Sequence, residues 1–249
     1  MSLLLRKKGN GPMTWDQEET RRLIAELFGN EQLELAKPAL RSVDDRMLYA
    51  QFHYQDAKRA FSDLYEEAKL NDVPLLVALH RTDEDWGKFN VAIRRIGAYL
   101  TACIQSIHSL ADILAHAILF SLALNRDHTE QQLRKLSSGK VVSELRKNPI
   151  YISLSDGLAS MIQHDHFKHL SALANMAKHQ SIVFPSLTEN WSNPNVPRHF
   201  LKFSSFRHDS NTYPEVVAND FLSAEFERCN MLAVETGCEL NKALSNMLH

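Results

Sequence analysis

The chain has 249 residues, with 28 Lys and Arg against 30 Asp and Glu, and a net charge of −2 at neutral pH. This balance excludes a globally basic protein that net charge would draw to nucleic acid or anionic lipid, so any such contact must use a local basic patch. Gly and Pro number only eight each, which favours long helices over many turns. The length allows one large domain or two small ones.

The cysteines and the apolar runs predict a cytoplasmic protein without a membrane-spanning segment. Cys103, Cys229 and Cys238 lack the spacing of a metal or redox motif, so we expect free thiols in a reducing compartment. The N-terminal run Met1–Lys8 passes from leucines directly to charged residues and is too short for a signal sequence. The most apolar run, 113–124, is about half the length needed to cross a bilayer.

Capping signals and apolar periodicity predict an N-terminal helical extension over residues 1–80. Thr14 opens a capping box for a first helix that ends at Gly29. Pro38 predicts a break after a short second helix. The next helix is expected to begin at Asp44 or Asp45.

The longest predicted helix runs from Thr82 to Leu124 and is expected to lie at the centre of the protein. Thr82 and Asp85 can cap its first turn. From Ile104 onward it is apolar nearly all round, which is typical of a buried helix. Gly97 is the expected position of a kink.

Shorter helices and a last long helix complete the prediction. Thr129 and Gln132 form a capping box for one short helix. Segment 184–213 is rich in Asn and Pro and predicts a long loop or a short β-hairpin, and Pro214 is expected to begin the last helix. Further helices are expected over 141–147, 155–162 and 165–181. We therefore predict an all-α helical bundle over residues 81–249, continuous with the N-terminal extension.

The helix expected over 165–181 carries the constellation that most strongly indicates a chemical task. Asn175, Lys178 and His179 are spaced at i, i+3 and i+4, so they share one face. A lysine beside an imidazole favours the neutral ring, which can act as a general base near pH 7. The alternative is that Lys178 and His179 complement the negative end of the helix dipole.

A second polar stripe lies on the long helix, where Asp112 is flanked by His108 and His116 at four residues on either side. A carboxylate in so apolar a section needs partners, and Lys178 or His179 could reach it from a neighbouring helix. Asp112 would then orient a catalytic histidine. The alternative is a buried polar network that fixes the register of the helices.

Clustered histidines and basic residues indicate two further kinds of site. His164, His166 and His169 lie close in sequence, but only Asp165 is near enough to add an acidic ligand, so no metal or other cofactor is expected. Local groups of basic residues either line a groove for phosphates or form solvated surface. These groups are Arg94-Arg95, Arg134-Lys135, Arg146-Lys147, and Arg198 with Lys202 and Arg207.

Two segments together resemble the HEPN superfamily over roughly residues 85–248: Ser106–Ala115 on the long helix and Asn175–His179 on the later one. The resemblance implies an α-helical bundle that is usually a homodimer and often a metal-independent ribonuclease. Such proteins act as toxins or in defence, while other members only bind nucleotides or proteins. Asn175 matches the polar residue of the family motif and His179 its histidine.

This chain departs from the family motif because the arginine is missing. The permitted positions hold Ala172, Leu173 and Ala174. One reading is a protein that cleaves or binds RNA, with His179 as the base for the 2′-hydroxyl and with Lys178 and Asn175 on the phosphate. The alternative is a non-catalytic interaction or nucleotide-binding module whose polar stripes are structural.

Overall fold

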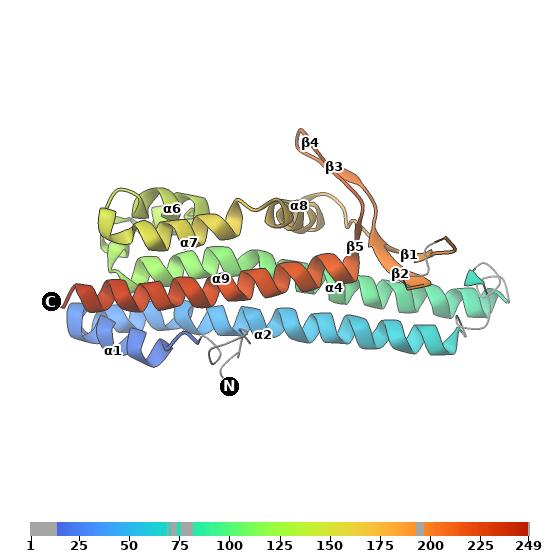
Figure 1. The fold of residues 1–249 in the computed structure, drawn as a ribbon, viewed down its shortest axis with the longest axis horizontal. Helices are drawn as coiled ribbons and strands as arrows, with labels where there is room; N and C mark the ends of the chain where they lie inside the picture. Colours follow the sequence, from blue (N-terminus) through green and yellow to red (C-terminus); the bar gives the residue numbers. More distant parts are fainter. Residues whose placement is uncertain (1–13, 69, 71–73, 76–81, 193–196, 249) are drawn as a thin grey trace. The chain divides into compact units, whose positions relative to one another are not determined.

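The computed structural model shows a mostly helical protein with a small amount of β-structure before the last helix (Figure 1). It describes residues 14–68, 70, 74–75, 82–192 and 197–248, so the run Met1–Lys8 lies outside the described residues. The chain divides into two compact units. Unit 1 comprises residues 1–47, 107–168 and 226–249, and unit 2 comprises 48–106 and 169–225. These divisions fall at other positions than the domain boundary predicted near residue 80.

Unit 1 is built from helices. They are α1 (Gln17–Phe28), the beginning of α2 (Asn30–Glu67), the end of α4 (Asp83–Ser121), η1 (Leu124–Asp127), α5 (Glu130–Arg134), α6 (Ser138–Leu145), η2 (Pro149–Tyr151), α7 (Ile152–Ile162), the first turn of α8 (Asp165–His179) and most of α9 (Ala218–Asn246). Their shared apolar faces form a core, and its fully buried side chains include Leu23, Ile24, Leu40, Leu114, Ile118, Leu145 and Leu240.

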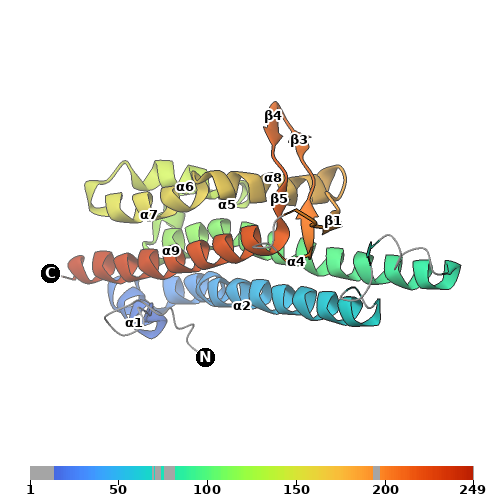
Figure 2. The same cartoon turned by 45° about the vertical axis from the view of Figure 1, so that its right-hand side comes forward.

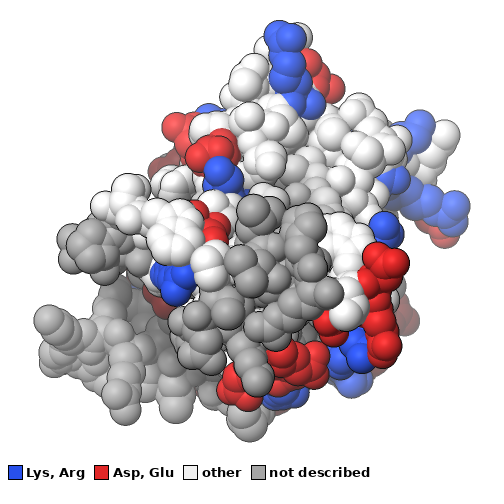
Figure 3. All heavy atoms as spheres, turned by 90° about the vertical axis from the view of Figure 1, so that its right-hand side faces the viewer, with Lys and Arg blue, Asp and Glu red and all other residues white. Residues whose placement is uncertain are grey.

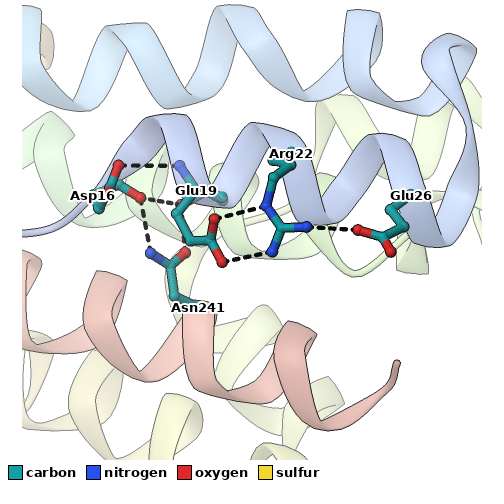
Figure 4. Close-up of polar contacts among 6 residues, drawn as sticks. Asp16, Glu19, Arg22, Glu26 and Asn241 are labelled. Atoms are coloured by element: carbon teal, nitrogen blue, oxygen red, sulfur yellow. Dashed lines mark hydrogen bonds and ion pairs between the residues drawn. The ribbon is translucent and has the colours of Figure 1, made fainter. Parts of the chain in front are cut away.

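The first helix begins at a different cap from the one predicted. The Asp16 carboxylate, and not Thr14, accepts the hydrogen bond from the Glu19 backbone N–H at 3.0 Å. The predicted end is confirmed, because Gly29 adopts a φ of 87° that side chains disfavour. Figure 4 shows Asn241 of α9 donating to the Asp16 carbonyl at 2.8 Å, which fastens the start of α1 to α9.

The break predicted at Pro38 is wrong, because α2 is one helix through that position. A proline in a helix interior removes one backbone hydrogen bond. Here the flanking side chains Ala36 and Leu40 are completely buried in unit 1. Their burial on both sides of Pro38 outweighs the lost bond and keeps the helix continuous.

The long helix α4 is confirmed close to its predicted bounds. Thr82 and Asp85 form the expected cap, with the Asp85 backbone N–H donating to the Thr82 hydroxyl at 3.0 Å. Gly97 lies under the ring of Phe184, where an added Cβ would stand 2.8 Å from a ring carbon. Among the described helices, α4 is long and apolar enough to cross a membrane, and 61% of its most apolar window is buried inside the protein. Buried core helices of soluble proteins have the same composition.

The helices after α4 differ from the prediction in their starts. The Thr129–Gln132 capping box of α5 is confirmed. Helix α7 begins at Ile152, three residues before the expected Ser155, because η2 leads directly into it. The Ser155 hydroxyl is buried and donates to the Val142 carbonyl of α6 at 3.2 Å.

Unit 2 combines helical segments with two small sheets, where the sequence predicted a loop or one short hairpin. β1 (Pro185–Glu189), β2 (His199–Phe203) and β5 (Val216–Val217) form an antiparallel sheet in the order β1-β2-β5. β3 (Phe206–His208) and β4 (Asn211–Tyr213) form a separate hairpin, visible in Figure 2. The last helix was predicted from Pro214, which is wrong. It begins at Ala218 because the two residues before it pair with β2.

All three cysteines are free, as the sequence predicted. Cys103 and Cys229 are buried and Cys238 is half-buried. Burial raises the pKa of the Cys103 thiol to about 12, which keeps it protonated and unreactive near neutral pH.

Candidate functional sites

The predicted catalytic residues lie together at the end of α8, in unit 2. Lys178 and His179 are exposed in the last turn, and Asn175 is half-buried one turn earlier. In this position both Lys178 and, when protonated, His179 complement the negative end of the helix dipole. Their exposure also leaves the side chains open to a substrate from solution.

Asp112 is stabilised by the start of a neighbouring helix in unit 1. It is half-buried on α4, and its carboxylate accepts a hydrogen bond from the Ser138 backbone N–H at 2.8 Å. Ser138 is the first residue of α6, where the preceding Ser137 makes no side-chain cap. The carboxylate therefore supplies the missing cap and also meets the positive end of the helix dipole.

The two histidines that flank Asp112 also have partners within unit 1. The His108 ring stacks on Phe167, with centroids 6.1 Å apart and an interplanar angle of 13°. His116 Nδ1 lies 2.8 Å from the backbone carbonyl of Asp112, one turn earlier on its own helix. Asp112, His108 and His116 belong to unit 1, whereas Asn175, Lys178 and His179 belong to unit 2. Neither unit alone brings the two stripes together, and their joint site stays a prediction.

The histidines near the start of α8 lie in different surroundings. His164 and His166 are exposed, with their ring centroids 5.1 Å apart and perpendicular. His169 is buried within unit 2 among three aromatic rings, whose centroids lie 5.0 to 5.4 Å from its own. These rings belong to Phe206, Tyr213 and Phe221. His169 thus helps to hold the β3–β4 hairpin on the helices of unit 2.

A groove of about 740 Å³ lies along α5 and α6 in unit 1, and we call it the basic groove. Its lining includes three lysines. Lys135 follows the last residue of α5, Lys140 lies in the first turn of α6, and Lys147 lies in the turn that follows α6. Gln131 and Gln132 also line the groove and have side-chain amides that can donate hydrogen bonds. The hydroxyl of Ser143 already donates to the Gly139 carbonyl.

The lysines of the basic groove have few acidic neighbours. Glu144 is the one carboxylate among the lining residues that the structure describes, and it pairs with Lys147 at 2.6 Å. Lys140 donates to the Lys135 carbonyl at 2.8 Å, which ties the start of α6 to the end of α5. Lys135 makes no ion pair with any described residue of the chain. The groove therefore holds more positive charge than its one described carboxylate neutralises.

The charge around the basic groove differs in sign from the charge of the chain. Residues 128–147 hold five Lys and Arg against two Glu, a net charge of +3, whereas the whole chain carries −2. Arg134 and Arg146 add cations beside the groove, each near an acidic residue at 3.6 and 3.9 Å. Such a local excess of positive charge attracts polyanions even when the net charge does not.

The sequence pointed to part of this groove. The doublets Arg134-Lys135 and Arg146-Lys147 were predicted to line a phosphate groove or to form solvated surface, and Lys135 and Lys147 do line the groove. The contributions of Lys140 and His128 were missed. The signal that could have found Lys140 is its place between the two doublets, five residues after Lys135 and seven before Lys147.

Comparisons with protein-family models, curated proteins and solved structures found no match to this chain. Function must therefore be inferred from the chemistry of the sites, and not from a shared fold. The resemblance of Asn175–His179 to the HEPN motif stays a prediction.

Proposed function

We propose that this protein binds RNA and that the basic groove holds the phosphodiester backbone. The observation that carries the proposal is the set of three lysines along one groove with a single carboxylate among the described lining residues. Lysine ammonium groups neutralise backbone phosphates and release their counterions, which supplies most sequence-independent affinity for nucleic acid. Gln131 and Gln132 add neutral donors to phosphate oxygens.

The groove favours recognition of the backbone over recognition of bases. No described lining residue is Phe, Tyr or Trp, and the imidazole of His128 is the one aromatic ring among them, so the groove has little surface on which unstacked bases can lie. We therefore expect little preference for base sequence. The ribose 2′-hydroxyl can accept from the Gln131 amide or donate to the Ser143 oxygen, and this contact distinguishes RNA from DNA.

The proposal is tested by fluorescence anisotropy with a labelled, unstructured 12-nucleotide RNA. The triple variant Lys135→Gln, Lys140→Gln, Lys147→Gln is expected to bind at least about tenfold more weakly than the unchanged protein, because three phosphate contacts are lost. The matched control is Lys37→Gln, Arg41→Gln, Lys242→Gln, which removes the same charge from exposed positions of unit 1 outside the groove. Equal weakening in both triples would mean that net charge alone acts, and the groove assignment would fail.

A second function, metal-independent RNA cleavage, is favoured by the exposure of Lys178 and His179 one turn beyond Asn175. In this reading His179 removes the proton of the 2′-hydroxyl, while Lys178 and Asn175 contact the phosphate. Purified protein and its His179→Ala variant are incubated with labelled RNA in the presence of a chelator, with His164→Ala as the exposed-histidine control. Loss of cleavage in His179→Ala alone would support catalysis. Binding without cleavage would support the non-catalytic alternative.

A further inference from the structure

A pocket of about 540 Å³ lies within unit 2, and we call it the Tyr65 pocket. Helices α2 and α4, strand β2 and the start of α9 supply its walls. Most of this lining is apolar and includes Phe61, Leu100, Leu201 and Val217. A pocket of this size and character is typical of sites for small organic ligands.

A buried histidine lies at one side of the Tyr65 pocket and is held by the sheet. His199 on β2 is directly opposite Glu189 on β1, and its side chain is fully buried. Nε2 lies 3.2 Å from the Glu189 carboxylate, and Nδ1 lies 3.4 Å from the Tyr65 hydroxyl. Arg198 also pairs with Glu189 at 3.0 Å, while its guanidinium covers the ring of Trp191 at 4.5 Å.

These contacts fix the position of each proton. An ionised carboxylate can only accept, so His199 Nε2 carries the hydrogen that Glu189 receives. Burial lowers the pKa of His199 and outweighs the opposite effect of the Glu189 carboxylate, so the ring is neutral near pH 7 and Nδ1 is an acceptor. The Tyr65 hydroxyl therefore donates its only proton to His199. Its oxygen keeps lone pairs that can accept a further hydrogen bond.

The charged residues that line the Tyr65 pocket balance one another. Lys58 and Arg198 are the described cations, and Glu66 and Asp220 are the described carboxylates. Lys58 also lies 5.7 Å from the centroid of the Tyr54 ring. The pocket thus has no net charge that would select an ionic ligand, and its apolar walls favour a neutral one.

We propose that the Tyr65 pocket binds a small, neutral, largely apolar organic molecule that carries one hydroxyl or N–H donor. The apolar walls cover its hydrocarbon part, and the Tyr65 oxygen accepts the hydrogen bond from the donor. His199 and Glu189 act as positioning residues. Glu189 orients His199, which accepts the Tyr65 hydroxyl proton, so the Tyr65 oxygen can only accept a hydrogen bond from a ligand. This site lies in unit 2 and is independent of the basic groove in unit 1.

The test uses two probes with the same ring system, 2-naphthol and 2-methoxynaphthalene, in which a methyl group replaces the donor hydrogen. Binding is measured by isothermal titration. The unchanged protein is expected to bind 2-naphthol about tenfold more tightly than the ether, the ratio that one net hydrogen bond provides. In Tyr65→Phe, which keeps the ring but lacks the oxygen, this ratio is expected to fall to about one. Tyr49→Phe on the same helix, outside the pocket, is the matched control and keeps the ratio.

A second variant separates loss of the acceptor from loss of the fold. Leu201→Trp adds bulk to the pocket wall and is expected to abolish binding of both probes, while the circular dichroism spectrum and RNA affinity stay unchanged. The proposal is overturned if neither probe binds the unchanged protein at millimolar concentration, or if the tenfold ratio persists in Tyr65→Phe. The triple lysine variant of the basic groove is expected to bind 2-naphthol normally, so the two sites can fail separately.

Discussion

The Asp112 carboxylate lies half-buried on α4 and accepts a hydrogen bond from the first backbone amide of α6. This geometry predicts a structural role. Asp112→Ala is expected to lower the free energy of unfolding by about 1 kcal/mol, the usual contribution of a side-chain cap. Asp112→Asn keeps an acceptor and is expected to lose less. Urea denaturation followed by circular dichroism measures both.

His179→Ala provides the comparison for Asp112, because His179 is exposed and most exposed substitutions change stability by less than about 0.5 kcal/mol. Asp112→Ala with unchanged stability would remove the capping role. A loss in His179→Ala equal to that in Asp112→Ala would instead favour one shared structural network.

His199 predicts a pH dependence of stability. Its folded-state pKa is lowered, chiefly by burial, whereas an unfolded histidine titrates near about 6.5. As pH falls below about 6.5 the unfolded chain binds the proton first, so the free energy of unfolding decreases until the folded-state pKa is also passed. The slope for this one proton is at most about 1.4 kcal/mol per pH unit.

Chemical denaturation between pH 8 and pH 5 tests this dependence. His199→Phe lacks the titrating group and is expected to show a shallower decrease over the same interval than the unchanged protein. His164→Gln, which removes an exposed imidazole, is the control. Parallel pH profiles for His199→Phe and the unchanged protein would contradict the assignment of a neutral, buried His199.

At the residue scale, side-chain spacing identified Asp112 as needing a partner but missed the partner that unit 1 supplies. That partner is the backbone N–H of Ser138, 26 residues further along the chain, and the pairing expected with Lys178 or His179 stays a prediction. Every residue except proline has a backbone N–H, so such a donor cannot be recognised from residue type. The sequence indicates it only through the predicted start of the helix to which it belongs. The Glu189–His199 pair was likewise missed, because strand register places the two residues opposite one another and spacing alone does not.

At the scale of elements, α1 is held against α9 by close packing as well as by hydrogen bonds. An added Cβ at Gly237 would lie 2.1 Å from a ring carbon of Trp15. Gly237→Ala must therefore displace the indole and is expected to lower the free energy of unfolding by about 1–3 kcal/mol. Gly87→Ala is the control, because an added Cβ there meets no described atom within 4 Å and a helical alanine gains up to about 1 kcal/mol over glycine.

The same denaturation experiment measures both glycine variants. Opposite shifts of the urea midpoint are expected, downward for Gly237→Ala and upward for Gly87→Ala. A midpoint for Gly237→Ala at or above that of the unchanged protein would show that α1 does not pack on α9 as described.

Helices with clear caps were predictable from sequence, whereas the short strands were not. Apolar periodicity sustained over many turns, with the Thr82 cap, was enough to place α4. The helix break predicted at Pro38 was wrong. A proline removes one helical hydrogen bond, but the burial of the side chains on both sides of Pro38 outweighs that loss. The strands have between two and five residues, too few for an alternating pattern to be distinguished from a loop. The two residues of β5 were likewise too few to be recognised, so α9 was predicted to begin before its actual start.

At the scale of the whole molecule, a total charge near zero conceals an uneven distribution. Residues 128–147 carry +3 in a chain of −2. Elsewhere the signs are mixed, as on the face in Figure 3, where Lys and Arg lie among Asp and Glu. Composition alone therefore gave no indication of the basic groove, while the basic doublets gave a partial one. The groove needs the packing of α5 beside α6, which local sequence patterns do not determine.

The central claim is that the lysines of the basic groove contact RNA phosphates, and the salt dependence of binding tests it most directly. For single strands each neutralised phosphate contributes about 0.7 to the slope of log K against log salt. The triple variant at Lys135, Lys140 and Lys147 is expected to have a slope about two units smaller in magnitude than the unchanged protein, while the Lys37, Arg41, Lys242 triple keeps the original slope. Identical slopes for all three proteins would contradict the claim.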